Sequence, residues 1–396
     1  MSVPVRSFAK INLGLRIGAA REDGFHELLT VYQTIGLHDG IRVSVARGTG
    51  IEIQCDDARV PKDETNTCYR IAEKAMQALG AKGRVVIEIE KRLPVQGGLG
   101  GASSNAVAVM LALERAVGRR LAAADRLRIA AEVGSDLPLF LVGGTVLGAG
   151  RGEQVYPLPD LPALACVVVT PEVGVSTPKA FAEWDRMQGL KPLSFDDPDA
   201  ALKRRSSTVV EVDLSLGAAS AALREIPTPA AKSAARMGQA RREVGAGARP
   251  HANSDASQPK LTAYDGSDRM NVLGRGLSAW LSEVGLARLY SGAPSGWKGR
   301  GRAENPLLWL VRAGIENDFE QVVFPEYPKL RAGKRALLRA GAKYASLSGS
   351  GSALYGLFAS KDAAVRAAAT LRKQGWAAQA TVTLTRRAYW RRIIAD

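Results

Sequence analysis

The sequence predicts an α+β fold with two domains. The chain has 396 residues, 46% hydrophobic and 23% charged, and a chain of this length and composition can bury more than one core. Stretches of alternating apolar residues, which indicate strands, are interleaved with stretches whose apolar spacing indicates helices. A continuous apolar run begins near Leu161 and reads as the first strand of a new unit. We therefore expect a first domain over about residues 1–160 and a second over about 161–396.

In the first domain, alternation from Val5 to Ile17 predicts a strand that carries Lys10 and Asn12 on the face opposite its apolar side chains. Helices are predicted where apolar spacing follows a capping residue, which for the first of them is Asn66 or Thr67. The further strands are expected at 40–46, 51–55 and 84–93, and the helices at 66–80, 103–118 and 121–134.

The second domain begins with a buried strand predicted at 163–171. Ordered pattern resumes near residue 305 and gives a helix, strand, helix, strand rhythm typical of α+β domains, through the segments 305–323, 329–347, 352–360, 363–375 and 378–384. Between them, about 200–300 is rich in Ala, Gly, Pro, Ser and Arg and shows little periodicity. We expect a long basic insertion there with a composition typical of disorder, and an inert loop is favoured over a binding segment.

The net charge of +15 is compatible with nucleic acid, membrane phosphates or an anionic substrate, and charge alone does not choose among them. Residues 200–304 hold 16 Lys and Arg against 9 Asp and Glu, so much of the excess is local. No apolar run is long enough for a membrane span, and the N-terminus lacks the order of a signal peptide. These features predict a soluble, cytoplasmic protein.

The cysteine and histidine contents limit the chemistry. Cys55, Cys68 and Cys166 are odd in number and widely separated, which favours reduced thiols over a disulfide framework. The three histidines show no metal-ligand spacing, so any metal ion is expected to be bound by oxygen atoms.

The most informative segment is LPVQGGLGGASSN, residues 93–105, which has four glycines in five positions, followed by two serines and an apolar helix. Glycines let backbone N–H groups approach an anion, and a helix N-terminus adds unpaired donors and positive dipole. The loop therefore suits phosphate, although a flexible turn that only caps the helix gives the same pattern. It matches neither GxxxxGK[ST] nor GxGxxG.

Together with two other segments, this loop resembles the GHMP kinase superfamily. AKINLGL at 9–15, the loop from Pro94 to Asn105, and SLSGSGSALYGLF at 346–358 stand in the order of that superfamily's three motifs. Within it, the sequence is similar to the kinases that act on 4-diphosphocytidyl-2-C-methyl-D-erythritol, through FAKINLGLRI, DGFHELLTVYQTIGLHD, GSDLPLFLVGG, GVSTPKAF and NDFEQVVFPEYP. The resemblance covers about 5–195 and 304–385.

This resemblance implies a fold and an activity. The expected fold is an N-terminal domain like the second domain of ribosomal protein S5 and a ferredoxin-like C-terminal domain, with the site between them. The expected activity is ATP-dependent, Mg²⁺-requiring phosphorylation of the 2-hydroxyl of the methylerythritol unit, a step of the non-mevalonate isoprenoid pathway. The implied partner is this small molecule, with no membrane and no nucleic acid, and the protein is expected to be a monomer or a homodimer.

The resemblance also implies a catalytic pair, Lys10 and Asp136. Asp136 would accept the proton of the acceptor hydroxyl, while Lys10 would keep it ionised and polarise the attacking oxygen. Local sequence favours other interpretations, because Asp136 stands where a helix N-cap is expected and a lysine on an edge strand is usually at the surface.

For the acceptor, the resemblance implicates Phe25 stacking on cytosine and His26 bonding to the base, with Tyr32 and Phe181 as weaker members of the same wall. The alternative for Phe25 and His26 is a core ring and a turn histidine. Thr177 would touch substrate or stabilise the turn before Pro178. Asn12 would hold substrate, and a second loop with Gly349, Ser350 and Gly351 would close over phosphate or substrate.

For ATP, the resemblance places Asn66 and Thr67 near adenine, with helix capping as the alternative for Asn66. Mg²⁺ would be held by phosphates, water and the hydroxyl of Ser103 or Ser104. Two departures from the family pattern are Gln96 and Ala102. The residues expected around the phosphates are Pro94, Gly97, Gly98, Leu99, Gly100, Gly101, Ser103 and Ser104.

Two rival functions keep some support. A sibling kinase acting on mevalonate or homoserine would retain the glycine loop without needing Phe25 and His26. A nucleic-acid-binding protein is suggested by the sequence pI of about 9.9, but the basic residues cluster outside the motifs.

Overall fold

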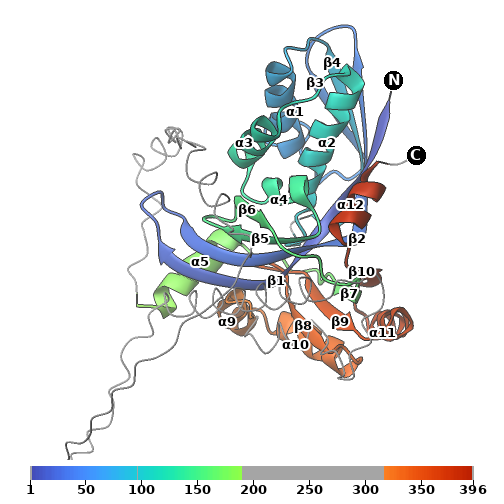
Figure 1. Ribbon diagram of the computed structural model, residues 1–396. Coiled ribbons are helices and arrows are strands. Elements are labelled where there is room, and N and C mark those ends of the chain that lie inside the picture. Colours follow the sequence, from blue (N-terminus) through green and yellow to red (C-terminus); the bar gives the residue numbers. More distant parts are fainter. Residues whose placement is uncertain (1, 96, 190–315, 395–396) are drawn as a thin grey trace, which may run out of the picture. The chain divides into compact units, whose positions relative to one another are not determined.

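The computed structural model describes residues 2–95, 97–189 and 316–394 (Figure 1). Gln96, the insertion at about 200–300 and the predicted pattern at 305–315 lie outside the described residues. The described part contains two sheets of six and four strands. Among its helices, none combines the length and the apolar character needed to cross a membrane.

The first sheet contains two long neighbouring strands, β1 (Val3–Ala20) and β2 (His26–Ala46). The strand predicted at 40–46 is only the end of β2, which runs for 21 residues. The sheet has the order β3-β4-β2-β5-β6, and β1 pairs antiparallel with β2. Its other strands are β3 (Ile51–Cys55), β4 (Arg84–Glu90), β5 (Thr145–Ala149) and β6 (Gln154–Pro157).

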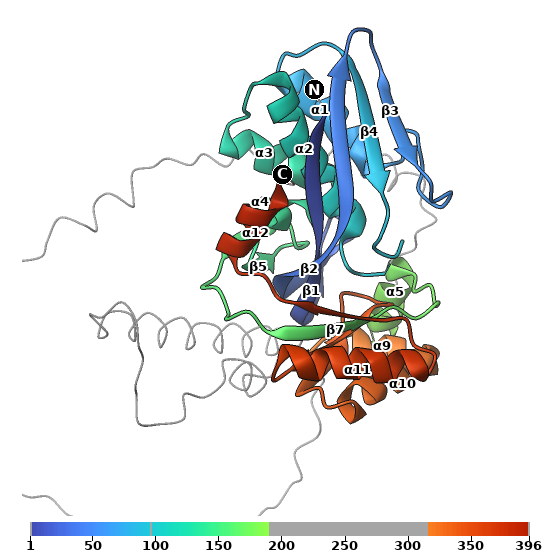
Figure 2. The same ribbon diagram turned by 90° about the vertical axis from the view of Figure 1, so that its right-hand side faces the viewer.

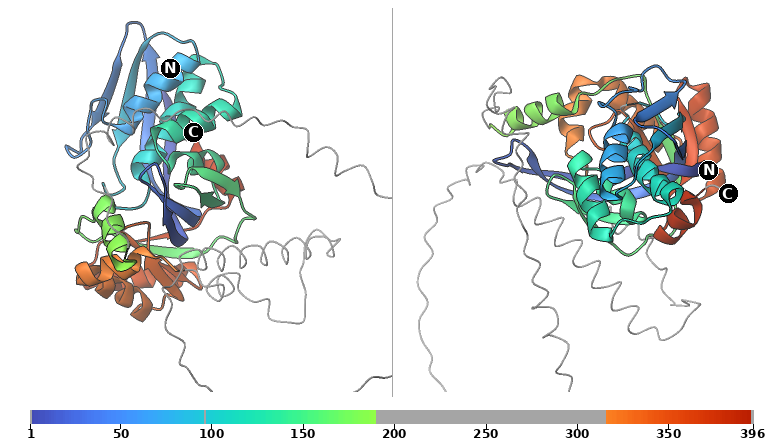
Figure 3. Two further views of the ribbon diagram at one scale, coloured as in Figure 1. Left: turned by 90° about the vertical axis from the view of Figure 1, so that its left-hand side faces the viewer. Right: turned by 90° about the horizontal axis from the view of Figure 1, so that it is seen from above.

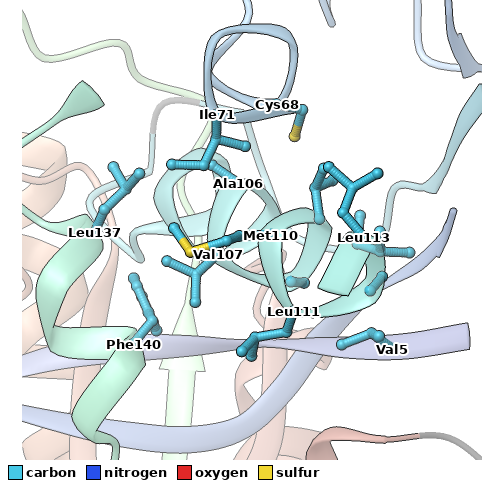
Figure 4. Close-up of a cluster of buried hydrophobic side chains, with 14 of the residues drawn as sticks. Val5, Cys68, Ile71, Ala106, Val107, Met110, Leu111, Leu113, Leu137 and Phe140 are labelled. Atoms are coloured by element: carbon cyan, nitrogen blue, oxygen red, sulfur yellow. The ribbon is translucent and has the colours of Figure 1, made fainter. Parts of the chain in front are cut away.

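The helices that accompany this sheet are α1 (Thr67–Ala78), α2 (Gly101–Val117), α3 (Ala123–Val133) and α4 (Leu137–Val142). Asn66 caps α1, because its side chain accepts a hydrogen bond from the N–H of Cys68 at 2.8 Å. The α2 helix begins at Gly101, earlier than predicted, and is buried over most of its length. Its side chains pack with Ile71 of α1 and with Leu137 and Phe140 of α4 (Figure 4).

The second sheet has the strand order β10-β7-β9-β8, with every neighbouring pair antiparallel. Along the described chain, one strand is followed by three helices, two strands, one helix and a last strand, which with this strand order is a ferredoxin-like arrangement and confirms that prediction. Figure 2 shows α10 and α11 beneath this sheet. The elements are β7 (Ala165–Val169), α5 (Thr177–Met187), α9 (Phe319–Glu326), α10 (Pro328–Arg339), β8 (Tyr344–Leu347), β9 (Leu354–Phe358), α11 (Lys361–Lys373) and β10 (Ala378–Val382).

The β1 strand is buried on both faces because it passes through three apolar clusters. Val5 packs with the helices of the first sheet, Ile11 packs with residues of β7 and β9, and Ile17 packs with the helices of the second sheet. Its register against β2 shifts between Phe8 and Lys10 and again beyond Asn12, which marks irregularities in the ladder. Lys10 is only 3% exposed, so the interpretation of a surface lysine on an edge strand is wrong.

A final helix, α12 (Arg386–Ile393), was not predicted. Tyr389 is buried, its ring lies 5.7 Å from that of Phe8, and its hydroxyl donates to the carbonyl of Phe140 at 2.7 Å. Ile394 bridges to Val5, so the end of the chain lies beside its beginning (Figure 3). The domain boundary near residue 160 stays a prediction, and α12 belongs to the core of the first sheet.

Candidate active site

Lys10 and Asp136 lie together at the centre of the candidate site. The Nζ of Lys10 lies 3.3 Å from Oδ2 of Asp136 and 2.7 Å from Oδ1 of Asn12. Asp136 directly precedes α4, but its side chain makes no capping hydrogen bond. The capping interpretation of Asp136 is therefore wrong, while the catalytic roles of the pair stay predictions.

Tyr32 provides the third contact to this pair. Its hydroxyl donates to Oδ1 of Asp136 at 3.0 Å, and Lys10 Nζ lies 5.4 Å from the centre of its ring. Burial, followed by the charge of Asp136, raises the pKa of Tyr32 well above its ordinary value of 10.0. Tyr32 thus remains a hydrogen-bond donor to Asp136. Its place in a wall around the base stays a prediction, and in the structure its hydroxyl meets the carboxylate of Asp136.

The two glycine loops meet each other beside Lys10. Ser348 donates from its hydroxyl to the carbonyl of Gly98 at 2.9 Å, and the N–H of Lys10 donates to the carbonyl of Leu99 at 2.9 Å. A β-carbon at Gly349 would lie 3.6 Å from Lys10 Nζ. Three segments that are distant in the chain therefore converge on one amine.

Asp39, which the sequence did not single out, holds the base of the first glycine loop. It is fully buried and accepts hydrogen bonds from Lys91 Nζ at 2.5 Å and from Asn105 Nδ2 at 3.0 Å. It also accepts from the N–H groups of Arg92 and Leu93, each at 2.7 Å. The only sequence signal for Asp39 was its place at the end of DGFHELLTVYQTIGLHD, one of the segments that carry the family resemblance.

Small side chains follow the same loop in the first turn of α2. Ser104 is buried and accepts a hydrogen bond from Ser7 at 2.7 Å, whereas Ser103 is partly exposed in the first turn of α2. Ala102 is exposed in that turn, and Thr67 donates to its carbonyl at 3.0 Å. A β-carbon at Gly97 would lie 2.9 Å from Pro94 Cγ, so this turn depends on glycine.

The predicted place of Asn66 near adenine has less support than its alternative, helix capping. The side-chain amide of Asn66 accepts from Cys68 and donates to the carbonyl of Pro61 at 2.6 Å. Both ends of the amide are used inside the protein, which supports helix capping as its role.

Phe25 and His26 mark the far end of β2 and have different surroundings. Phe25 is 44% exposed, and the Arg151 guanidinium carbon lies 4.9 Å from its ring centre. His26 is buried, with Nε2 2.7 Å from Oδ1 of Asp185, which was not predicted. Phe181, predicted as a wall for the base, stacks on the His26 ring at 4.8 Å. Phe25 is therefore the aromatic ring with a free face.

Thr177 and Asn317 support the second glycine loop. The hydroxyls of Thr177 and Ser350 lie 2.7 Å apart, so Thr177 contacts that loop as well as beginning α5. Asn317, which prediction missed, donates from Nδ2 to the carbonyls of Leu347 and Gly349 at 2.9 and 2.8 Å. The N–D dipeptide in the quoted segment NDFEQVV was the signal.

Comparison with known proteins agrees with this architecture. The family described as GHMP kinases N terminal domain matches residues 66–144, and GHMP kinases C terminal matches residues 307–376. A protein of Solibacter usitatus named 4-diphosphocytidyl-2-C-methyl-D-erythritol kinase is 32% identical over 99% of this chain and 93% of its own length. A Nocardioides protein of the same name is 41% identical over 50% of this chain and 68% of its own.

Solved structures share the fold. A crystal structure of 4-(cytidine 5'-diphospho)-2C-methyl-D-erythritol kinase aligns with a TM-score of 0.59 and 24% identity, over 96% of this chain and 98% of that one. A homoserine kinase from Cytophaga hutchinsonii aligns with a TM-score of 0.55 and 19% identity, over 97% and 95% of the two chains. These alignments show the GHMP kinase fold, and the full-length sequence similarity distinguishes among its branches. The chain is a member of the 4-diphosphocytidyl-2-C-methyl-D-erythritol kinase family.

Proposed function

We propose that this protein transfers the γ-phosphoryl group of ATP to the 2-hydroxyl of 4-diphosphocytidyl-2-C-methyl-D-erythritol, releasing ADP. The observation that carries the proposal is the ion pair of Lys10 and Asp136 at the junction of two glycine loops, in a chain of this kinase family. Phosphoryl transfer requires mainly alignment, neutralisation of phosphate charge and removal of one proton. The site offers a group for each.

Asp136 accepts the proton of the acceptor hydroxyl in this proposal. The hydroxyl oxygen forms a bond to the γ-phosphorus, and the bond between that phosphorus and the bridging oxygen to the β-phosphate breaks. Tyr32 donates a hydrogen bond to the carboxylate and Lys10 places a positive charge beside it, and together they hold the carboxylate in position. Lys10 would also stabilise the negative charge that develops on the reacting oxygen.

The first glycine loop and the N-terminus of α2 would bind the triphosphate, because backbone N–H groups and the helix dipole both favour anions. The described residues contain no group of three or more His, Cys, Asp or Glu side chains placed to hold a metal ion. As the resemblance implies, Mg²⁺ would be bound by phosphate oxygens, water and a serine hydroxyl, and Ser103 fits this role better because Ser104 is turned towards Ser7. When bound, it would neutralise phosphate charge.

The test is an assay with ATP, Mg²⁺ and the cytidine substrate, with the product detected by mass spectrometry and ³¹P NMR. We expect ADP and a monophosphorylated product whose new phosphate is on the 2-hydroxyl. Mevalonate and homoserine, offered in parallel, should give no ADP above background. Efficient phosphorylation of either one, with none of the cytidine substrate, would replace the proposed function by that of a sibling kinase.

A further inference from the structure

Asp185 and His26 form a buried pair at the end of β2 distant from Asp136. The two side chains are 2.7 Å apart, between Oδ1 and Nε2, and Asp185 is only 7% exposed. A carboxylate accepts hydrogen bonds and donates none when ionised, so the proton between them belongs to Nε2. The remaining ring nitrogen, Nδ1, is then the atom of His26 left to meet a ligand.

One helix holds the ring from two directions. Phe181 and Asp185 are four residues apart on α5, a spacing that puts both on one side of a helix. Phe181 covers a face of the imidazole, with the rings 10° from parallel, and its own ring meets Phe319 edge-on at 4.9 Å. The ring of His26 is thus fixed in plane by Phe181 and in rotation by Asp185.

Nδ1 of His26 has no hydrogen-bond partner among the described residues, and it is not among the fully buried polar side-chain atoms that lack one. Phe25, the residue before it, supplies an exposed ring, and aromatic rings bind the faces of nucleobases by stacking. Phe25 and His26 are the two neighbouring residues to which the family resemblance assigns the base.

We propose that Asp185 is a specificity-determining positioning residue for the base contact that the family resemblance assigns to His26. Asp185 holds the imidazole in the tautomer whose unprotonated Nδ1 accepts a hydrogen bond from the exocyclic amino group of cytosine. Cytosine presents this N4 amino donor where uracil presents an oxygen acceptor. An Nδ1 acceptor therefore binds a cytidine diphosphate compound and repels its uridine counterpart. The inference rests on the proposed function and adds to it the residue that sets the choice of base.

Two substitutions and one control test the pair. Asp185→Asn retains the shape of the side chain but can donate or accept, so it no longer fixes the tautomer, and Asp185→Leu removes the partner altogether. Glu183→Gln neutralises a carboxylate on the same helix that pairs with Arg186 and does not contact His26. Calorimetry with CDP and UDP measures base preference without turnover, and kcat/KM with the cytidine and uridine substrates measures it during turnover.

We expect the preference for CDP over UDP to fall by about tenfold or more in both Asp185 variants, the worth of one well-placed base contact. The kcat at saturating cytidine substrate should remain within about twofold, because Asp185 does not touch the reacting atoms. Glu183→Gln should keep the wild-type preference. An unchanged preference in both Asp185 variants would overturn the inference, as would a loss of kcat with an unchanged preference.

A spectroscopic measurement separates this inference from the proposed function. The ¹⁵N shifts of the His26 ring, assigned by comparison with His26→Gln, should show a protonated Nε2 and an unprotonated Nδ1 in the wild-type enzyme with CDP bound. Protonation of Nδ1 in that complex would overturn the inference even in an active kinase. An enzyme that shows this tautomer and prefers CDP, but transfers no phosphate to the cytidine substrate, would refute the proposed reaction and leave the role of Asp185 standing.

Discussion

Gly98 and Ser348 approach each other so closely that a β-carbon on Gly98 would clash with the carbonyl oxygen of Ser348. Gly98 also has φ +73°, a conformation in which side chains are strained. The contact joins the loop expected to bind phosphate to the loop from the second sheet.

We expect Gly98→Ala to lower kcat/KM by at least about a hundredfold, because the strain of about 1 to 2 kcal/mol adds to a backbone clash that separates the loops. Gly118→Ala is the matched control, since Gly118 has φ +72° at the other end of α2 with no atom nearby. It should lose a similar amount of stability from strain and keep its activity. Equal losses of activity in the two variants would show that the contact with Ser348 does not matter.

Asp136→Asn and Lys10→Met should each lower kcat by two or more decades, as expected for the loss of a general base or of its charge partner. Binding of ATP, measured by calorimetry, should persist. Asp125→Asn and Lys74→Met are the controls, because they change the same residue types in exposed ion pairs. Each should alter the free energy of unfolding by no more than about 1 kcal/mol and leave kcat unchanged. Wild-type turnover in either site variant would refute its assigned role.

Tyr32→Phe should lower kcat by about ten- to a hundredfold, because a hydrogen bond to a charged group contributes about 1.5 to 3 kcal/mol. The pKa of Tyr32 is raised, so its neutral, donating form persists as the pH rises through 10. The pH profile of kcat for the wild type should therefore show no alkaline loss due to Tyr32 below pH 10, and the variant should have a profile of the same shape. A fall in the kcat of the wild type below pH 10 that is absent from Tyr32→Phe would contradict this.

Asn317→Asp should destabilise the second glycine loop, because a carboxylate would face the carbonyl oxygens of Leu347 and Gly349 that the amide now satisfies. The expected loss is about 1 to 3 kcal/mol in the free energy of unfolding, with a raised KM. Denaturant unfolding and steady-state kinetics measure both. Gln77→Glu, which alters an exposed amide on α1, is the control and should change neither.

Tyr389→Ala should lower the free energy of unfolding by about 3 to 5 kcal/mol, the range for truncating a large buried aromatic side chain. Trp390→Ala, at a neighbouring ring that is 37% exposed, should have a clearly smaller effect. Thermal unfolding of both variants gives the comparison. Equal shifts in Tm would mean that α12 is not part of the first core.

The fold was predictable where one pattern determined an element. The cap of α1, the apolar spacing of α1 and α2, and the alternation of β1 are properties of short segments, and the boundaries of these elements were nearly correct. The full 21-residue length of β2 was missed because the strand has several different neighbours along its length, so it shows no single apolar pattern. The helix α12 was missed because it is stabilised by contact with β1.

The site was only partly predictable for the same reason. Local sequence made Asp136 a helix cap and Lys10 a surface residue, and only the resemblance to a known family brought them together. Asp39, Asp185 and Asn317 were missed because each acts through a partner distant in the chain, and no local spacing encodes such a pairing.

The unbroken course of β2 has a consequence for which molecules the enzyme accepts. His26 begins the strand and Tyr32 lies six residues farther along it, so at about 3.3 Å per residue their α-carbons are separated by roughly 20 Å along the strand. In the proposed reaction, an acceptor whose base is held beside His26 must reach Asp136 with its hydroxyl. The proposed reaction therefore predicts a length requirement: an alcohol attached directly to a nucleoside, without the diphosphate spacer, should bind without being phosphorylated.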